Sequence, residues 1–134
     1  MGGSVFEGGC LCGLVRYRAE AEPFSPTHCH CTLCRKATGA AYVSWASFPI
    51  SSLTWTAGKP SQYASSPQAL REFCGQCGTQ LTFRHQDFPD DIDITLASLD
   101  EPERIKPLCH IWTQSHIDWA PLDDLPAYPK STRD

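Results

Sequence analysis

Hydrophobic and polar residues alternate along this chain in short runs, separated by glycine, proline and other turn-forming residues. Successive side chains of a strand point to opposite faces, so short runs rich in β-branched and aromatic residues predict β-strands. The predicted strands are residues 14–18, 41–48, 53–56, 70–73, 81–85 and 93–96. Within 41–48, two sets of side chains alternate: Tyr42, Ser44 and Ala46 against Val43, Trp45 and Ser47.

Helical patterns are scarce. We expect one short helix, from about Thr32 to Thr38, with Gly39 as its C-terminal cap. The proline-spaced tail, residues 121–134, is predicted to lie along the surface. Repeats and linkers are absent from the sequence, and 134 residues suit one domain with a real core. The pattern therefore predicts a single mostly-β domain over residues 1–134.

The charge balance argues against some classes of protein. The formal net charge is -4, from 11 Lys and Arg against 15 Asp and Glu, which disfavours nucleic-acid binding. No apolar run approaches the length of a membrane span. Residues 1–7 lack the basic start and apolar run of a signal peptide, so we expect reduced cysteines and a cytoplasmic protein.

Seven of the eight cysteines fall into three tight clusters: Cys10 with Cys12, then Cys29, Cys31 and Cys34, then Cys74 with Cys77. Zinc takes four ligands in structural sites and keeps one position open in catalytic sites. Seven thiols divide into four and three, which predicts one closed and one open zinc site. A disulfide framework is disfavoured, because thiols one residue apart are poorly placed to bond each other.

The two doublets suit a four-thiolate site. An extended Cys10-x-Cys12 segment would place both thiols on one side, and Cys74 to Gly78 has the form of a zinc knuckle. Spacing alone leaves the pairing open, because Cys31 and Cys34 could also pair with either doublet. The lone Cys109 is expected to be a buried thiol without metal.

The remaining cluster, Cys29, Cys31 and Cys34, would leave a fourth zinc position for water or a substrate thiol. Arg35 and Lys36 follow directly, and they either offset the thiolate charge, hold a substrate carboxylate or form an ordinary solvated surface.

Three histidines are further candidates. His28, His30 and His110 each could supply a fourth ligand or an acid–base group, with a structural or surface role as the alternative. An extended segment would point His30 away from Cys29 and Cys31.

Four segments together resemble the glutathione-dependent formaldehyde-activating enzyme family, also called the centromere protein V-like family. They are GGCLCGLVRY (8–17), CHCTLCRK (29–36) with Gly39 and Ala40, FCGQCGT (73–79) with Leu81, and HIW (110–112). The similarity runs over about residues 8–126, nearly the whole chain.

This resemblance implies a tent-like, zinc-stabilised all-β fold. It implies a structural zinc on Cys10, Cys12, Cys74 and Cys77, and a second, open zinc on Cys29, Cys31 and Cys34. It also implies a carbon–sulfur lyase that joins glutathione and formaldehyde in S-hydroxymethylglutathione, with a small thiol and a small aldehyde as partners. Arg35 and Lys36 would then orient the substrate carboxylates. The alternative is a non-catalytic, zinc-stabilised module that binds a protein partner.

Overall fold

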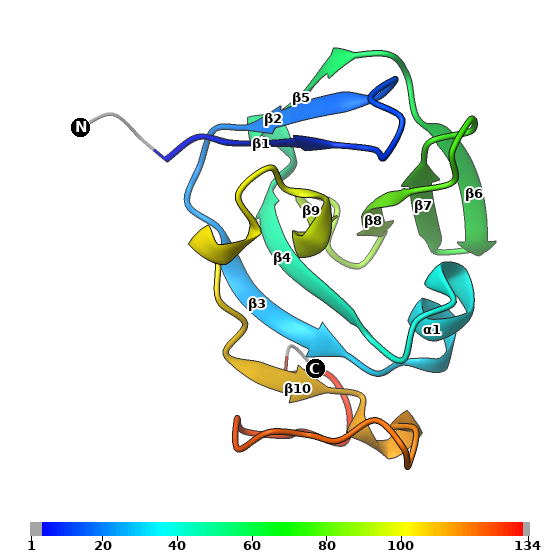
Figure 1. Ribbon diagram of the computed structural model, residues 1–134, viewed down its shortest axis with the longest axis vertical. Helices are drawn as coiled ribbons and strands as arrows, with labels where there is room; N and C mark the ends of the chain where they lie inside the picture. The colour runs from blue at the N-terminus through cyan, green and yellow to red at the C-terminus, as the bar shows by residue number, and fades with distance from the viewer. Residues whose placement is uncertain (1–3, 133–134) are drawn as a thin grey trace.

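The computed structural model describes residues 4–132, and these form two open β-sheets with one short α-helix (Figure 1). The predicted mostly-β fold is confirmed. The strands are β1 (Phe6–Gly9), β2 (Arg16–Ala19), β3 (Phe24–Cys29), β4 (Val43–Pro49), β5 (Leu53–Ala57), β6 (Ser61–Ser66), β7 (Ala69–Phe73), β8 (Gln80–His85), β9 (Asp91–Thr95) and β10 (Cys109–Ile111). Short 3₁₀ turns cover Ile50–Ser52, Leu96–Ser98, Pro102–Arg104 and Thr113–Ser115.

The smaller sheet has the antiparallel order β1-β2-β5, and the larger sheet has the order β10-β3-β4-β9-β8-β7-β6. All neighbours in the larger sheet are antiparallel except β10, which pairs in parallel with β3. In that pair His110 lies opposite His28, and Ile111 lies opposite Cys29. Residues far apart in the sequence therefore meet beside the second cysteine motif.

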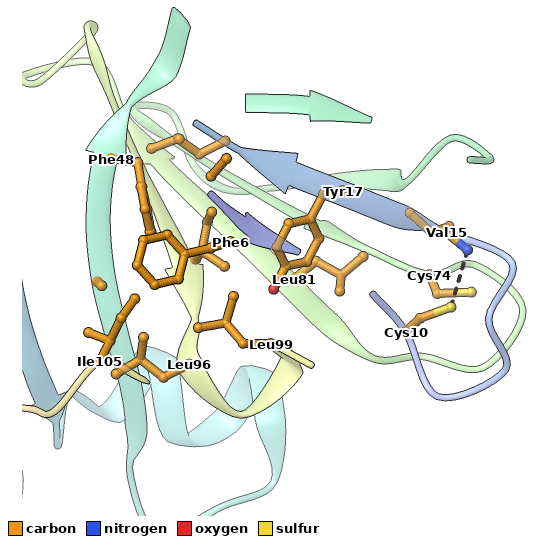
Figure 2. Packing of buried hydrophobic residues seen from close by; sticks show 14 residues of the cluster. Phe6, Cys10, Val15, Tyr17, Phe48, Cys74, Leu81, Leu96, Leu99 and Ile105 are labelled. Carbon is orange, nitrogen blue, oxygen red and sulfur yellow. Dashed lines mark hydrogen bonds between the residues drawn. The ribbon is translucent and has the colours of Figure 1, made fainter. Parts of the chain in front are cut away.

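The main core lies between the two sheets (Figure 2). Phe6 of β1 packs edge-on against Phe48 of β4, with 5.7 Å between the ring centroids, and Tyr17 and Leu81 are fully buried nearby. Strand β4 is buried on both faces. Its Ala46 and Phe48 belong to this core, whereas Val43 and Trp45 belong to a second cluster. The alternation predicted for residues 41–48 is thus confirmed, and β4 separates the core from the functional site.

Most predicted elements are confirmed within a few residues. Helix α1 covers Thr32–Thr38, and Gly39 ends it in the left-handed region at φ 68°, with its N–H on the Arg35 carbonyl. Strand β2 starts only at Arg16, because the preceding residues form a turn. The prediction that Cys10-x-Cys12 is extended was also wrong, because residues 11–12 belong to that turn. Strands β1, β3, β6 and β10 were not predicted.

The described part of the tail, residues 121–132, lies along β10. The His110 N–H donates to the Pro126 carbonyl at 2.8 Å, and the Tyr128 N–H donates to the His110 carbonyl at 2.9 Å. The surface position predicted for this segment is confirmed, while residues 133 and 134 fall outside the described range. Within residues 4–132, helices have neither the length nor the apolar character that crossing a membrane requires.

Candidate functional site

The two cysteine doublets lie together, where the turn between β1 and β2 meets the turn between β7 and β8. The Sγ atoms of Cys10, Cys12, Cys74 and Cys77 all lie within 4.8 Å of one another, with 3.6 Å between Cys10 and Cys12 and 3.8 Å between Cys12 and Cys74. Zinc–sulfur bonds of about 2.3 Å in a tetrahedron give sulfur–sulfur distances of about 3.8 Å. The four thiols therefore fit a tetrahedral zinc ion, and we call them the four-thiol site.

Backbone donors of the same turns surround these sulfurs. The N–H groups of Gln76 and Cys77 point to Cys74 Sγ at 3.4 Å, and the Val15 N–H points to Cys10 Sγ at 3.3 Å (Figure 2). Gly78, at φ 86°, has the left-handed backbone conformation that a side chain rarely adopts, and this lets the knuckle close around Cys74. These donors orient the sulfurs.

A single threonine links the two turns. The Leu11 N–H donates to Thr79 Oγ1 at 3.0 Å, which leaves the Thr79 hydroxyl proton for Cys77 Sγ at 3.3 Å. Hydrogen bonds from the side chain and then the backbone of Thr79 lower the pKa of the Cys77 thiol to about 5. One half-buried member of the four-thiol site is thus a thiolate at neutral pH.

The other cysteines lie where β3 ends and α1 begins. Cys29 is the last residue of β3, Cys31 precedes the helix, and Cys34 lies in its first turn. The Sγ atoms of Cys29 and Cys34 are 3.6 Å apart. Hydrogen bonds from Cys29 and Cys34 lower the pKa of the Cys31 thiol to about 2, whereas hydrogen bonds with Cys31 and Cys34 raise the pKa of Cys29. The cluster therefore holds one thiolate readily, and a cation is needed to make all three thiols anionic.

All three of these cysteines, here called the three-thiol cluster, line one cavity of about 340 Å³. Its wall is the face of the larger sheet turned away from the main core. Trp45 and Phe83 form its apolar side, with 6.0 Å between their ring centroids. Ser65, Arg71 and Ile111, which are discussed below, also line this cavity. The four-thiol site does not contribute to this cavity.

Two polar groups in this wall were not predicted from the sequence. Arg71 of β7 is 4% exposed, and its Nη2 lies 3.8 Å from Cys34 Sγ. Its Nε and Nη1 atoms, and the Ser65 Oγ, are buried without a hydrogen-bond partner. The sequence did contain a signal for Arg71, because it is a charged residue inside the predicted strand 70–73. Successive side chains of a strand point to opposite faces, so Arg71 had to lie on the opposite face from Leu70 and Glu72.

The basic pair singled out in the sequence lies on α1, outside the wall of the cavity. Arg35 is half-buried, and its Nη2 donates to Thr32 Oγ1 at 3.2 Å. Lys36 is exposed and lines a second, shallower hollow next to the cavity, to which Arg71 and Ser65 also belong.

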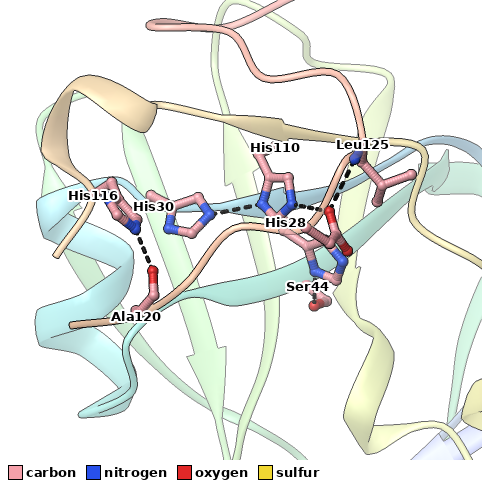
Figure 3. Close-up of polar contacts among 8 residues, drawn as sticks. His28, His30, Ser44, His110, His116, Ala120 and Leu125 are labelled. Carbon is pink, nitrogen blue, oxygen red and sulfur yellow. Dashed lines mark hydrogen bonds and ion pairs between the residues drawn. The ribbon is translucent and has the colours of Figure 1, made fainter. Parts of the chain in front are cut away.

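The histidine candidates gather on the opposite side of β3 (Figure 3). The carboxylate of Asp123 accepts from His110 Nε2 at 2.8 Å, and His110 Nδ1 shares a hydrogen bond of 2.9 Å with His30 Nε2. His28 Nδ1 is 2.8 Å from Ser44 Oγ. Burial, then the neighbouring histidines, lower the pKa of His30 to about 4, so its ring is neutral. Among these histidines, none lines the cavity of the three-thiol cluster.

Cys109 starts β10 beside this histidine group. The prediction of a buried thiol was too strong, because the side chain is half-buried, although burial still raises the pKa of the thiol. All eight cysteines are free thiols, which agrees with rejecting a disulfide framework.

Comparison with known proteins places the chain in a family. The sequence profile described as "Glutathione-dependent formaldehyde-activating enzyme" matches residues 5–115. The chain therefore belongs to the glutathione-dependent formaldehyde-activating enzyme family, as its cysteine motifs predicted.

Two curated relatives are similar along much of the chain. A putative glutathione-dependent formaldehyde-activating enzyme of Halomonas elongata is 27% identical over 132 residues, covering 89% of this chain and 82% of the relative. An uncharacterized lyase of Schizosaccharomyces pombe is 36% identical over 88 residues, covering 60% of this chain. That second match spans only 58% of the yeast protein's length.

The fold also matches a solved structure. The crystal structure of a Rhodobacter sphaeroides protein superposes with a TM-score of 0.61 at 21% identity, covering 90% of this chain and 98% of the other. The two proteins share the architecture of their sheets.

Proposed function

We propose that this protein is a zinc-dependent carbon–sulfur lyase that makes or breaks the adduct of a small thiol and a small aldehyde, such as S-hydroxymethylglutathione. Membership of the family and the names of the two relatives support a glutathione-related lyase. The observation that carries the proposal is the three-thiol cluster: three cysteines converge on the wall of a cavity of about 340 Å³. Pockets of this size accommodate small molecules.

Two metal ions with separate roles fit the donor sets. Cys10, Cys12, Cys74 and Cys77 would hold a structural zinc, because their sulfurs already have tetrahedral spacing. Cys29, Cys31 and Cys34 would hold a second zinc, with 3.6 Å between two of the sulfurs. Zinc bound there would supply the positive charge that keeps a substrate thiol deprotonated at neutral pH.

The reaction needs no oxidant or reductant. In the forward direction, a sulfur lone pair forms a bond to the aldehyde carbon, the carbonyl π pair moves to oxygen, and the oxygen takes a proton. In reverse, the hydroxyl loses its proton, the carbonyl re-forms, and the carbon–sulfur bond breaks to release the thiol. Atoms and charges balance in both directions.

The side chains around the cluster suit this chemistry. Trp45, Phe83 and Ile111 give the cavity an apolar wall that limits water around the reacting sulfur. Arg35 and Lys36 lie on α1 outside this wall, and their proposed role is to attract and orient an anionic substrate as it approaches. Eight free thiols also suit a reducing compartment such as the cytoplasm.

Calorimetric titration of the zinc-loaded protein with glutathione tests the proposal, together with NMR exchange measurements on glutathione and formaldehyde. We expect two zinc ions per chain, one bound thiol and faster exchange between the free thiol and its hydroxymethyl adduct. Binding should weaken as pH falls, because protons compete for the sulfur. A protein with one zinc, no thiol binding and no faster exchange would instead be the non-catalytic interaction module.

A further inference from the structure

Arg71 is a buried charge without a carboxylate partner. Its guanidinium is 4% exposed, and the ion pairs among residues 4–132 include none that involves it. Its contacts are Cys34 Sγ, 3.8 Å from Nη2, and the ring of Phe83, whose centroid lies 4.8 Å from Cζ. Burying an ionised group without compensation is strongly unfavourable, so a further anion is expected beside it.

The neighbouring acid on the same strand does not fill this role. Glu72 points to the other face of β7, as alternation requires. Its carboxylate accepts from Thr82 Oγ1 at 2.8 Å and from Gln62 Nε2 at 3.0 Å, and it lies 3.6 Å from Arg84 Nη2. Strand β7 therefore carries an ion-paired carboxylate on one face and a guanidinium without an ion pair on the cavity face.

The contact with Cys34 uses only one of the three nitrogen atoms of the Arg71 guanidinium. The Cys34 Sγ atom lies 3.8 Å from Nη2, while Nε and Nη1 have no hydrogen-bond partner although both are buried. A mainly structural arginine that merely balances the cysteine charge would leave these two groups unsatisfied at a substantial free-energy cost. An oxyanion in the cavity would satisfy them, because a guanidinium matches the geometry of a carboxylate.

A second unused donor lies in the same wall. Strand β6 shifts its register against β7 between Ala64 and Ser66, so Ser65 is the extra residue of a bulge. Bulges change the direction of a side chain. Ser65 lines both the cavity and the adjoining hollow together with Arg71, and its Oγ is buried without a hydrogen-bond partner.

We propose that Arg71, assisted by the Ser65 hydroxyl, binds a carboxylate of the substrate, and that the protein therefore prefers thiols whose carboxylate lies close to the reacting sulfur. This inference rests on the proposed function, since the sulfur is placed beside Cys34. Arg71 is then a substrate-binding residue inside the cavity, distinct from the basic pair on α1. Phe83 holds its guanidinium plane in place.

Calorimetry on the zinc-loaded protein tests the proposal with two small thiols, mercaptoacetate and mercaptoethanol, which differ in the carboxylate. We expect mercaptoacetate to bind at least about tenfold more tightly, the usual effect of one charge-assisted hydrogen bond. Arg71→Gln should abolish that preference, so that the two thiols bind with equal affinity, and Ser65→Ala should reduce the preference in part. Arg84→Gln is the matched control, because Arg84 faces Glu72 on the opposite side of the sheet, and it should keep the preference.

The salt dependence of the carboxylate preference distinguishes an effect of Arg71 from an effect of Arg35 and Lys36 on α1. A preference due to the buried Arg71 should persist at high salt, whereas one due to the exposed Lys36 should largely disappear. Equal loss of affinity for both thiols in Arg71→Gln would overturn the proposal, because the arginine would then act only through Cys34. Arg71→Lys is the second variant, for use if Arg71→Gln loses the second zinc, because it keeps the positive charge. An unchanged carboxylate preference in Arg71→Lys would also contradict the proposal, because a lysine cannot bind a carboxylate through two parallel hydrogen bonds as a guanidinium does.

A thiol-free probe distinguishes failure of this inference from failure of the proposed function. Titration with acetate should shift the Arg71 Nε–H resonance in a ¹⁵N NMR spectrum of the zinc-loaded protein, and Ser65→Ala should weaken the effect. An acetate response without any thiol binding would support the anion site and refute the lyase proposal. Thiol binding without a carboxylate preference or an acetate response would refute the anion site alone.

Discussion

The two groups of cysteines differ first in how far apart their members lie along the chain. The four-thiol site joins Cys12 to Cys74 across 62 residues, so it ties the small sheet to the far end of the large sheet. The three-thiol cluster lies within residues 29–34, at the junction of β3 and α1. A metal that closes a long loop stabilises the whole fold, whereas a local site mainly orders its own segment.

They differ also in what surrounds the sulfur atoms. In the four-thiol site, N–H groups of the two turns and the Thr79 hydroxyl point at the sulfurs, and these cysteines line neither the cavity nor the adjoining hollow described above. The three-thiol cluster lies beside an apolar cavity with unused donors on Arg71 and Ser65. Thiols whose surroundings the protein completes suit a stabilising role, whereas thiols beside unused donors suit ligand binding.

The largest effect is expected at the four-thiol site. Cys77→Ser should lose one zinc and destabilise the fold by several kcal/mol, because binding energy at structural zinc sites is folding energy on the order of 10 kcal/mol. Metal quantification and thermal unfolding measure both results. Cys109→Ala is the matched control, since this half-buried thiol lies in neither group of cysteines, and it should keep both zinc ions. A Cys77→Ser protein with unchanged metal content and melting temperature would remove the structural role.

A smaller effect on stability is expected at the three-thiol cluster. Cys34→Ser should empty the second metal site and abolish thiol binding while the sheets stay folded, because the cluster is local. We expect destabilisation of about 1–2 kcal/mol from this buried position. Circular dichroism and metal analysis decide the result. Global unfolding like that of Cys77→Ser would show that the two sites do not divide stability and chemistry between them.

The smallest effect concerns an ion pair next to the four-thiol site. Both Nη atoms of Arg16 donate to Asp100, Nη1 at 2.9 Å, and this hydrogen bonding lowers the pKa of the Asp100 carboxyl. The folded-state pKa is thus below the unfolded value, so the stabilisation is present above about pH 4 and is lost as pH falls through the folded value.

Both side chains are substantially exposed, so Asp100→Asn should cost less than about 1 kcal/mol at pH 7. Urea unfolding of the zinc-loaded protein at pH 7 and near pH 3 measures the difference between the variant and the natural protein. A difference that grows toward low pH would contradict the assigned direction of the pKa shift.

The sequence by itself determined the fold class, the helix and the identity of the metal-ligand candidates. Helix α1 ends at Gly39 because a glycine favours the left-handed cap, which is a local property. The alternation in residues 41–48 could be predicted from the sequence because β4 is buried on both faces, and each face packs in a different hydrophobic cluster. Motif spacing was sufficient to identify the family, since ligand spacing is a chemical constraint on short segments.

Other elements have no such local signal. Strand β1 ends in Gly8 and Gly9, and Gly8 is needed there because a Cβ would lie 2.4 Å from the Tyr17 hydroxyl. Strand β10 is three residues long and forms through parallel pairing with β3, about 80 residues earlier. Strand pairing over such distances depends on the assembled sheet and not on the propensity of the segment.

Tertiary structure alone decided the composition of the cavity. It put the three-thiol cluster next to Arg71 and Ser65, and it brought His110 beside His30, whose position away from the cysteines the strand alternation had predicted. A guanidinium is costly to bury, and only the fold reveals whether its donors have partners. The sequence therefore identified the candidate metal ligands, whereas the packing of β6, β7 and α1 decided which charged group lines the cavity beside them, because that contact joins segments that are separate along the chain.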